Sequence, residues 1–277
     1  MIFFCLELFP ECPVAENHSR TVVAGGSITE IVYFLGQEDI LTAVDITSNY
    51  PEEALQLPSI GYVRALSTEG ILSLEPTLIM GENDMGPELV VDQIRTTGLD
   101  MRIIDDDYSL QSIKNKVFCI GEIIGMKEGS RRIFTEKLGQ TYDSLKTIQV
   151  SNINDRKRIM VILNIDGTSP IVAGSETSGD GFIKMTGAVN AAGNFKGWKP
   201  VGPESIIEMN PDAIIITERG MRNYKDVKEF IEKTSLTFTN AALNNKVITF
   251  DGMEMLGFGP RSLKAALDIS KIVNDTK

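Results

Sequence analysis

Tyr62 and Arg64, in the segment GYVR, form the first chemical pair of interest in this sequence. Side chains at positions i and i+2 of an extended segment share a face, so the guanidinium can approach the phenol oxygen. A nearby cation favours the charged form of a phenol, and a phenolate is a hard anionic ligand suited to ferric iron. A half-buried tyrosine beside Pro58 and a plain surface arginine fit the same spacing, so the pair by itself predicts a candidate site and no more.

A glycine-rich segment, GMEMLGFGPR, supplies further candidates at residues 252–261. Arg261 is expected near the start of a helix, where arginine can pair with a carboxylate and where anions are favoured. Met253 or Met255 can approach a metal or a flat ring, although methionine more often fills gaps in a core. The segment GGSITE, from Gly25, can offer backbone amides to a carboxylate but lacks the GxGxxG spacing of a dinucleotide site.

The histidine and cysteine content argues against several kinds of site. His18 is the one histidine, and it is expected in an extended N-terminal tail, which makes Ser-His-Asp and Cys-His catalysis and multi-histidine metal sites improbable. The three cysteines, Cys5, Cys12 and Cys119, contain no CxxC pair, which argues against a disulfide framework and a thiolate zinc site. Cys119 is expected to be a buried thiol, and a Cys5–Cys12 bond is left open.

Composition places the chain among ordinary globular proteins. Its 277 residues are 42% hydrophobic and 23% charged, enough for one large domain or two smaller lobes. No apolar run approaches the roughly 18 residues of a membrane helix, so the mature protein is expected to be soluble. The formal charge of -11 argues against nucleic acid or anionic lipid as a partner. Residues 1–19 are interpreted as a tail or a signal remnant, although their apolar start lacks a positive n-region.

Alternating strand and helix patterns predict two α/β lobes. Residues 20–126 contain the apolar strands RTVVAGG, ILTAVD, TLIM and MRIID, and a helix, SITEIVYFLG, for which Ser27 and Glu30 predict a capping box. Residues 127–149 predict one long helix, and residues 150–277 resume the pattern with IMVILNID, AIIIT and VITFD. The sequence therefore predicts two Rossmann-like lobes with mostly parallel sheets, joined by a single long helix.

A repeat of helix, proline and strand occurs once in each lobe. LSTEGILSLEPTLIM matches VGPESIIEMNPDAIII without gaps at an offset of 135 residues, which pairs Glu69 with Glu204. Each glutamate is expected in the first turn of a helix, where an acidic side chain complements the helix dipole. Trp198, the single tryptophan, precedes its copy by nearly the same distance as Tyr62 precedes the other. Two similar lobes imply a ligand cleft between them.

The segment GYVRALSTEGILSLEPTLIM, with NAAGNFKGWKPVGPESIIEMNPDAIIIT and VITFDGMEMLGFGPR, resembles the periplasmic haem-binding proteins of bacterial ABC importers. The resemblance covers roughly residues 20–273. More broadly, the chain is similar to the cobalamin- and siderophore-binding proteins, whose class III fold has two lobes joined by one long helix. The resemblance implies a periplasmic substrate-binding component for iron uptake, not an enzyme, that captures haem in the inter-lobe cleft.

The resemblance also implies roles for particular residues. Tyr62 matches the tyrosine that binds the haem iron through its phenolate. An indole can stack on a porphyrin, and arginines can meet its propionates. Some relatives place a histidine on the other side of the iron, which His18 does not allow here, so five-coordinate iron or a weak sixth ligand is expected. The other haem-pocket or propionate candidates are Arg64, Trp198, Arg261, Met253 and Met255.

Partners follow from the same resemblance. In the resembling proteins one glutamate on each lobe pairs with arginines of the permease, which assigns Glu69 and Glu204 to docking on the ABC permease subunits of the inner membrane. An outer-membrane receptor system is a further implied partner, and no nucleic acid is expected. The nearest alternative is the same fold binding cobalamin or a ferric siderophore. A nucleotide-dependent α/β enzyme is less favoured, because the sequence has no phosphate loop and no plausible base–nucleophile set.

Overall fold

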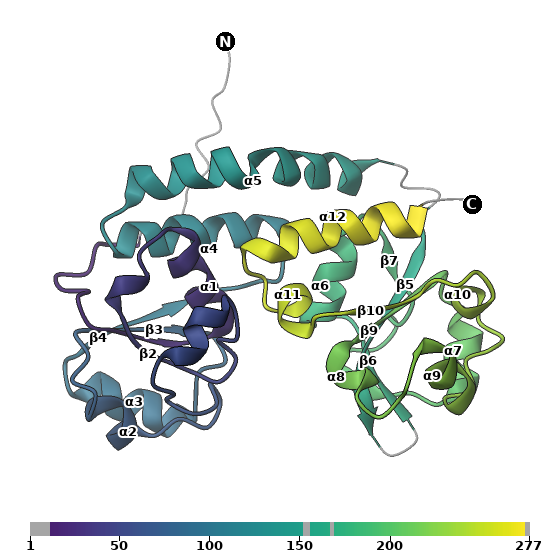
Figure 1. Ribbon diagram of the computed structural model, residues 1–277, viewed down its shortest axis with the longest axis horizontal. Coiled ribbons are helices and arrows are strands. Elements are labelled where there is room, and N and C mark those ends of the chain that lie inside the picture. The colour runs from purple at the N-terminus through teal and green to yellow at the C-terminus, as the bar shows by residue number, and fades with distance from the viewer. Residues whose placement is uncertain (1–11, 152–155, 167–168, 275–277) are drawn as a thin grey trace, which may run out of the picture. The chain divides into compact units, whose positions relative to one another are not determined.

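The computed structural model describes residues 12–151, 156–166 and 169–274 of the chain. The chain folds into two compact units (Figure 1). The first unit comprises Met1–Asp106 and Gln111–Lys137, and the second comprises Asp107–Leu110 and Leu138–Lys277. In the part of the chain that the structure describes, no helix is both long and apolar enough to cross a membrane.

Four parallel strands form the sheet of the first unit, in the order β2-β1-β3-β4. Strands β1 and β3 are buried along nearly their whole length, which explains why the sequence shows them as continuous apolar runs rather than as alternating patterns. All four strands occur where the sequence predicts them. They are β1 (Thr21–Ala24), β2 (Leu41–Val44), β3 (Leu78–Glu82) and β4 (Asp100–Ile104).

Four helices follow these strands in the first unit. They are α1 (Gly26–Phe34), α2 (Thr68–Leu72), α3 (Glu88–Thr96) and α4 (Leu110–Ile123). One apolar core joins strand residues such as Val22 and Ile79 to Ile71 of α2 and Ile94 of α3, and all four are fully buried. This core also contains Val63, which lies in the loop before α2 and anchors the candidate site described below.

The second unit has a six-stranded mixed sheet in the order β10-β9-β5-β6-β8, with β7 paired to β5. Strands β10, β9 and β5 are parallel, as the sequence predicts, but β6 is antiparallel to both β5 and β8. Strand β6 begins so soon after β5 that only an antiparallel hairpin can join them. The strands are β5 (Arg158–Asp166), β6 (Ser169–Ala173), β7 (Val189–Asn190), β8 (Trp198–Pro200), β9 (Ala213–Thr217) and β10 (Val247–Phe250).

The helices of the second unit are mostly short. Their buried side chains, including Ile206 of α7 and Phe230 of α9, pack with Ile214 and Ile216 of β9 in one core. The final helix, α12, occurs where the sequence predicts it. The helices are α6 (Ser178–Met185), α7 (Pro203–Met209), α8 (Glu218–Met221), α9 (Val227–Lys233), α10 (Asn240–Leu243), α11 (Gly252–Leu256) and α12 (Pro260–Asn274).

One long helix, α5 (Lys127–Val150), carries the chain from the first unit into the second. It has 24 residues and few buried side chains, among them Phe134, Tyr142 and Leu145. The division between the units falls inside this helix, after Lys137. The sparse apolar pattern that predicts a long helix with few core positions therefore belongs to a helix shared by two units.

The sequence repeat is also a repeat of structure. Strands β3 and β9 have equal length, and their first residues, Leu78 and Ala213, are 135 positions apart. Helix α2 precedes β3 as α7 precedes β9, and each helix buries its matching isoleucine completely. The predicted first-turn positions of Glu69 and Glu204 are confirmed, because Ser67 caps α2 and Gly202 with Pro203 opens α7.

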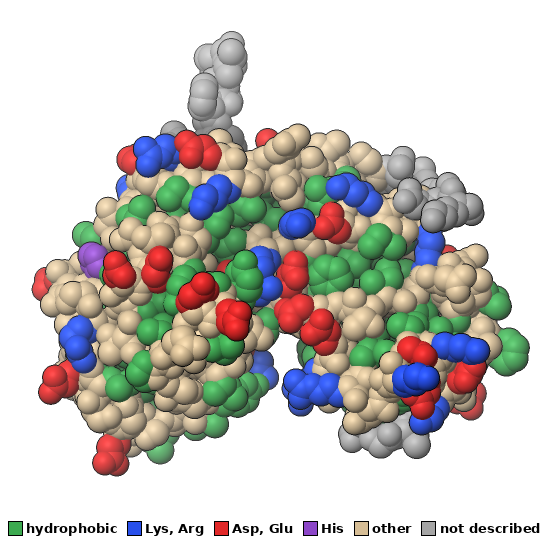
Figure 2. Space-filling model, in the orientation of Figure 1, with side chains coloured by type: hydrophobic (Ala, Val, Ile, Leu, Met, Phe, Trp, Pro, Cys, Tyr) green, Lys and Arg blue, Asp and Glu red, His purple; other side chains and the backbone are tan. Residues whose placement is uncertain are grey.

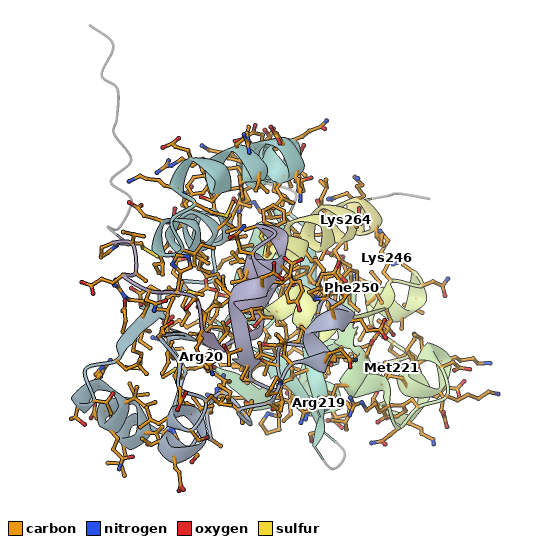
Figure 3. All side chains as sticks on the ribbon, turned by 60° about the vertical axis from the view of Figure 1, so that its left-hand side comes forward. Arg20, Arg219, Met221, Lys246, Phe250 and Lys264 are labelled. Atoms are coloured by element: carbon orange, nitrogen blue, oxygen red, sulfur yellow. A yellow bond between two sulfur atoms is a disulfide. The ribbon has the colours of Figure 1, made fainter. Side chains whose placement is uncertain are left out.

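A matching arginine contact supports this repeat in each unit. Arg20, directly before β1, donates from Nη2 to the carbonyl oxygen of Leu74 at 2.5 Å (Figure 3). Arg158, the first residue of β5, donates from Nη2 to the carbonyl oxygen of Met209 at 3.0 Å. Leu74 and Met209 are aligned in the repeat, and both carbonyls lie just after a helix or at its last turn, where backbone acceptors lack partners within the helix. Both units therefore use the same contact to attach a helix to the sheet.

The described part of the N-terminal segment is held against the first unit. Cys12 and Cys119 form a disulfide across a sequence separation of 107 residues, and the Ala15 N–H donates to the carbonyl oxygen of Ile123 at 2.9 Å. The prediction of a free buried thiol at Cys119 is therefore wrong, and Cys12 is not available to Cys5. Cys5 and the rest of residues 1–11 lie outside the described residues. The pairing depends on packing against α4, which cysteine spacing cannot reveal.

We expect loss of the Cys12–Cys119 bond to lower the free energy of unfolding by about 2–5 kcal/mol, because a disulfide restricts the unfolded chain. Urea unfolding of Cys119→Ser and wild-type protein at one pH measures the difference. Cys5→Ser is the matched control and should unfold like the wild type. Peptide mapping without reductant that finds Cys5 bonded to Cys12 would contradict the assignment.

Candidate functional site

Tyr62 lies on the loop between β2 and α2, and this loop is held against the sheet before it reaches the tyrosine. The Ile60 N–H donates to the carbonyl oxygen of Val44, the last residue of β2, at 2.9 Å. The Ile46 N–H then donates to the carbonyl oxygen of Gly61, also at 2.9 Å. Gly61 has a φ of 89°, a left-handed conformation that glycine adopts without strain. The chain therefore turns at Gly61 and presents Tyr62 from a fixed position.

The residues after Tyr62 are anchored just as firmly. Val63 is 3% exposed and belongs to the core of the first unit. Its carbonyl oxygen accepts the Gly86 N–H at 2.9 Å, and the Gly86 carbonyl accepts the Leu66 N–H at the same distance. Burial of Val63 leaves its neighbours exposed, with Tyr62 at 41%. The phenol is thus accessible while its backbone is held in place.

Arg64 pairs with a carboxylate rather than standing alone on the surface. Its Nε and Nη2 lie 2.8 Å and 2.6 Å from Oδ2 of Asp84. The other oxygen of Asp84, Oδ1, is buried and has no hydrogen-bond partner. Asp84 was not identified from the sequence, because it follows β3 and meets Arg64 only through folding. Residues 62–65 form a turn closed by the Ala65 N–H, which donates to the carbonyl oxygen of Tyr62 at 2.7 Å, so the expectation of an extended segment with Tyr62 and Arg64 on one face is wrong.

The amides at the start of α1 are already occupied by the protein's own acceptors. Gly25 N–H donates to Oδ1 of Asp45 and Gly26 N–H to Oγ1 of Thr47, both at 3.0 Å. Ser27 N–H donates to Oε1 of Glu82 at 3.2 Å. The expectation that GGSITE offers amides to a ligand carboxylate is therefore wrong. The predicted Ser27 capping box is wrong too, since α1 has Gly25 as its N-cap without a side-chain cap.

A buried lysine links this helix start to two acidic residues. Lys116 is 1% exposed, and its Nζ donates to Oδ2 of Asp106 at 2.5 Å and to Oγ of Ser27 at 3.0 Å. Ser27 Oγ in turn donates to Glu82 at 2.6 Å. Burial raises the pKa of Glu82 above its ordinary value, and the positive charge of Lys116 opposes this change. The cluster joins α1, β3 and α4 inside the first unit.

Trp198 lies at the edge of the second unit's sheet, where it opens β8 and pairs with Ala173 of β6. It is half-buried. A Cβ on Gly179 would lie 3.0 Å from Cη2 of the indole, so the ring packs closely on the start of α6. One side of the indole is therefore covered and another part is accessible, as expected for a rim tryptophan.

The segment from Met253 to Arg261 runs from α11 into the first turn of α12, and its candidates differ in burial. Met255 is fully buried and fills the core of the second unit, whereas Met253 is partly exposed. Arg261 lies in the first turn of α12, 3.8 Å from a carboxylate oxygen of Glu254. Burial raises the pKa of Glu254, and the charge of Arg261 opposes this change. Arg261 and Met253 are thus the accessible members of this group.

Glu69 and Glu204 are both exposed in the first turn of their helices, one in each unit. Ser67 Oγ accepts the Gly70 N–H at 3.2 Å, so α2 is capped without help from Glu69. Figure 2 shows basic and acidic side chains interspersed on the face in view rather than gathered in one basic patch. In the hydrogen bonds found at these two helix starts, neither glutamate side chain acts as a cap.

The other features that could form a site are His18, a cluster of metal ligands and a cavity. His18 is partly buried rather than fully exposed, and its Nδ1 has no hydrogen-bond partner. Among the described residues, no group of three His, Cys, Asp or Glu side chains is arranged to hold a metal ion. A cavity of about 470 Å³ lies in the second unit near the ends of α5 and α12, next to Arg156 and Lys271. None of the candidate site residues lines it.

Comparisons with known proteins define the class. The model of the periplasmic binding protein family matches residues 22–253. The chain is similar to the uncharacterized ABC transporter substrate-binding lipoprotein YvrC of Bacillus subtilis (strain 168), with 22% identity over 89% of this chain and 77% of the relative. It is also similar to the vitamin B12-binding protein of Photorhabdus laumondii, with 24% identity over 92% of this chain and 88% of that protein.

A solved structure gives a higher identity. The periplasmic heme-binding protein HutB of Vibrio cholerae shares 31% of its residues with this chain, at a TM-score of 0.81. That alignment covers 94% of this chain and all of HutB.

The fold and these matches define a substrate-binding protein of the kind that serves ABC transporters. The chain belongs to the periplasmic binding protein family. The predicted family resemblance and the two-lobed class III fold are both confirmed. The family and its relatives also support a transport role and an extracytoplasmic location.

The raised pKa of Glu82 predicts a pH-dependent contribution to stability. A carboxyl whose pKa is higher in the folded than in the unfolded state stabilises the fold at low pH, and this contribution is lost as the pH rises from the unfolded pKa through the folded pKa. Glu82→Gln should remove this component, so that the variant gains stability relative to the wild type as the pH rises. Urea unfolding across about pH 4 to 8 measures it.

Glu16→Gln is the control, because Glu16 is an exposed acid of the same unit that lies outside its helices and strands. Its unfolding curve should follow the wild type at each pH. Parallel pH profiles for Glu82→Gln and wild-type protein would contradict the prediction.

Proposed function

We propose that this chain captures haem as the substrate-binding component of an ABC importer, with Tyr62 as the iron ligand. The observation that carries the proposal is the exposed phenol of Tyr62 on a loop held at both ends by backbone hydrogen bonds. An axial ligand has to reach the iron with little loss of conformational freedom, and a fixed backbone meets that requirement. The 31% identity to a heme-binding protein supports haem as the ligand.

The chemistry of the site fits ferric iron. A phenolate is a hard, anionic ligand, and tyrosine is an established axial ligand of haem. Binding to iron displaces the phenol proton, and a nearby cation makes that loss easier. Arg64, held by Asp84, is the cation that we assign to this role or to a propionate. With no histidine assigned to the opposite side, the proposal is five-coordinate iron or a weak sixth ligand.

The second unit supplies the remaining proposed contacts. Trp198 offers part of its indole for stacking against the porphyrin. We assign Arg261, in the first turn of α12, to a propionate, which it would meet through a charge-assisted hydrogen bond. Met253 is the methionine that we keep as a contact, since Met255 is completely buried.

Delivery requires docking on a membrane permease, and we assign this to Glu69 and Glu204. Each glutamate is exposed at an equivalent position of a repeated helix. Helix-dipole stabilisation explains either residue alone but not their matched positions. Complementary charge on two permease subunits orients a complex and speeds association. The proposed setting is the periplasm, downstream of an outer-membrane receptor system.

Cobalamin is the second candidate ligand. The vitamin B12-binding protein of Photorhabdus laumondii aligns over 92% of this chain, which favours this alternative over a ferric siderophore. Titration with haemin and with cyanocobalamin separates the candidates. Saturable binding of cyanocobalamin without a Soret change on haemin addition would replace haem as the proposed ligand.

Substitution of Tyr62 tests the iron ligand. Tyr62→Ala and Tyr62→Phe should each weaken haemin binding by more than about 100-fold, since loss of a group that merely supports a metal ligand already costs 10–100-fold. Both variants should also lose the spectrum of phenolate-ligated ferric haem. Tyr33→Phe is the control, as a partly buried phenol of the same unit, and should behave as the wild type. Unchanged spectra for both Tyr62 variants would rule out this assignment.

Charge reversal tests docking. The double variant Glu69→Lys with Glu204→Lys should retain haem affinity but lose permease binding and stimulation of ATPase activity. The matched control is Glu88→Lys with Glu218→Lys, which reverses exposed first-turn acids of α3 and α8. Both double variants lose a helix-dipole contribution of about 0.3–1 kcal/mol per residue. Normal uptake by the first variant, or equal loss in both, would end the docking assignment.

A further inference from the structure

A four-residue segment of the chain, Asp107–Leu110, packs with the second unit although β4 before it belongs to the first. Oδ1 of Asp107 accepts the Ser109 N–H at 3.0 Å and closes a tight turn. Between them, Tyr108 has a φ of 57°. A left-handed conformation is uncommon for an aromatic residue and persists only where the surroundings impose it.

The surroundings that impose it are on α6 and the loop before α12. A Cβ on Gly181 would lie 2.2 Å from the carbonyl oxygen of Tyr108 and 2.6 Å from its Cβ, so glycine is required there. The Tyr108 ring lies 5.3 Å from the ring of Phe258, at an interplanar angle of 53°. Phe258 is fully buried and also left-handed, with a φ of 53°. Two strained aromatic residues therefore support each other.

Tyr108 is nevertheless 37% exposed. Packing in the core explains the strained backbone of Phe258, which has no exposed surface. It does not explain the strained backbone of Tyr108, whose ring stays at the surface. Phe258 is separated by two residues from Arg261, the residue in the first turn of α12 that we assign to a propionate. The strained tyrosine thus lies beside the loop of the second unit that carries a candidate anion contact.

We propose that Tyr108, backed by Phe258, is a contact surface for the flat face of the tetrapyrrole ligand. An aromatic ring offers a large rigid area for stacking at little cost in side-chain entropy. The inference rests on the proposed haem-binding function and adds a ligand contact that the sequence pattern did not reveal. It predicts that the ring of Tyr108 matters for affinity, whereas its hydroxyl matters little.

Two substitutions separate the ring from the hydroxyl. Tyr108→Phe should bind haemin as the wild type does, and Tyr108→Leu should bind about ten-fold more weakly, as expected for loss of one aromatic contact. Phe238→Leu is the matched control, since Phe238 is an aromatic residue of the same unit with 77% exposure, and it should not alter affinity. Wild-type affinity in Tyr108→Leu, or equal weakening in both Tyr108 variants, overturns the inference.

Nitration of the wild-type protein tests the same contact without a substitution that disturbs the strained turn. Tetranitromethane should modify Tyr108 in the ligand-free protein, and peptide mass analysis should find that haemin protects it. Equal nitration with and without haemin overturns the inference. Wild-type protein without any Soret response to haemin overturns the proposed function as well, so the two failures are distinguishable.

Discussion

Burial of Val63 in the core of the first unit constrains the part of the candidate site that this unit supplies. Residues 62–65 form a turn, which the Ala65 N–H closes by donating to the carbonyl oxygen of Tyr62 at 2.7 Å. Within this turn Val63 enters the core, while Tyr62 and Arg64 on either side of it are exposed. The backbone hydrogen bonds of Gly61 and Gly86 then fix the direction of that exposure. The apolar contact of Val63 and these backbone hydrogen bonds together determine where the phenol is presented.

The polar groups of the first unit serve a different purpose. Asp45, Thr47 and Glu82 satisfy the first amides of α1, where many α/β proteins bind an anionic ligand. The amides at this helix start are therefore occupied within the protein, and the proposed ligand contacts are side chains elsewhere in the two units. It also explains the presence of Lys116 in the interior, since a buried carboxylate needs a nearby cation. The charged side chains of this buried cluster thus have their partners within the same unit.

Sequence patterns predicted what depends on local rules. Apolar runs predicted the strands, and the offset of 135 residues predicted two matched helix–strand pairs, whose helices begin and whose strands begin and end at matching positions. The capping box at Ser27 failed because its competitor, Glu82, is distant in sequence and near in space. The Cys12–Cys119 bond, the Arg64–Asp84 pair and the placement of Tyr108 escaped prediction for the same reason. Strand β8 has three residues, too few for a periodic signal, and β6, although apolar, is antiparallel because of its short connection to β5 and not because of its own residues.

The Cys12–Cys119 bond distinguishes two stages of the chain, one before the disulfide forms and one after it. Disulfides persist in oxidising compartments, and the cytosol keeps thiols reduced. Before export, residues 12–19 are attached to α4 by noncovalent contacts such as the Ala15–Ile123 hydrogen bond. The newly made chain is therefore easier to unfold than the mature protein, which suits passage through a membrane. Oxidation afterwards closes the N-terminal segment onto the first unit and makes the folded state harder to reverse.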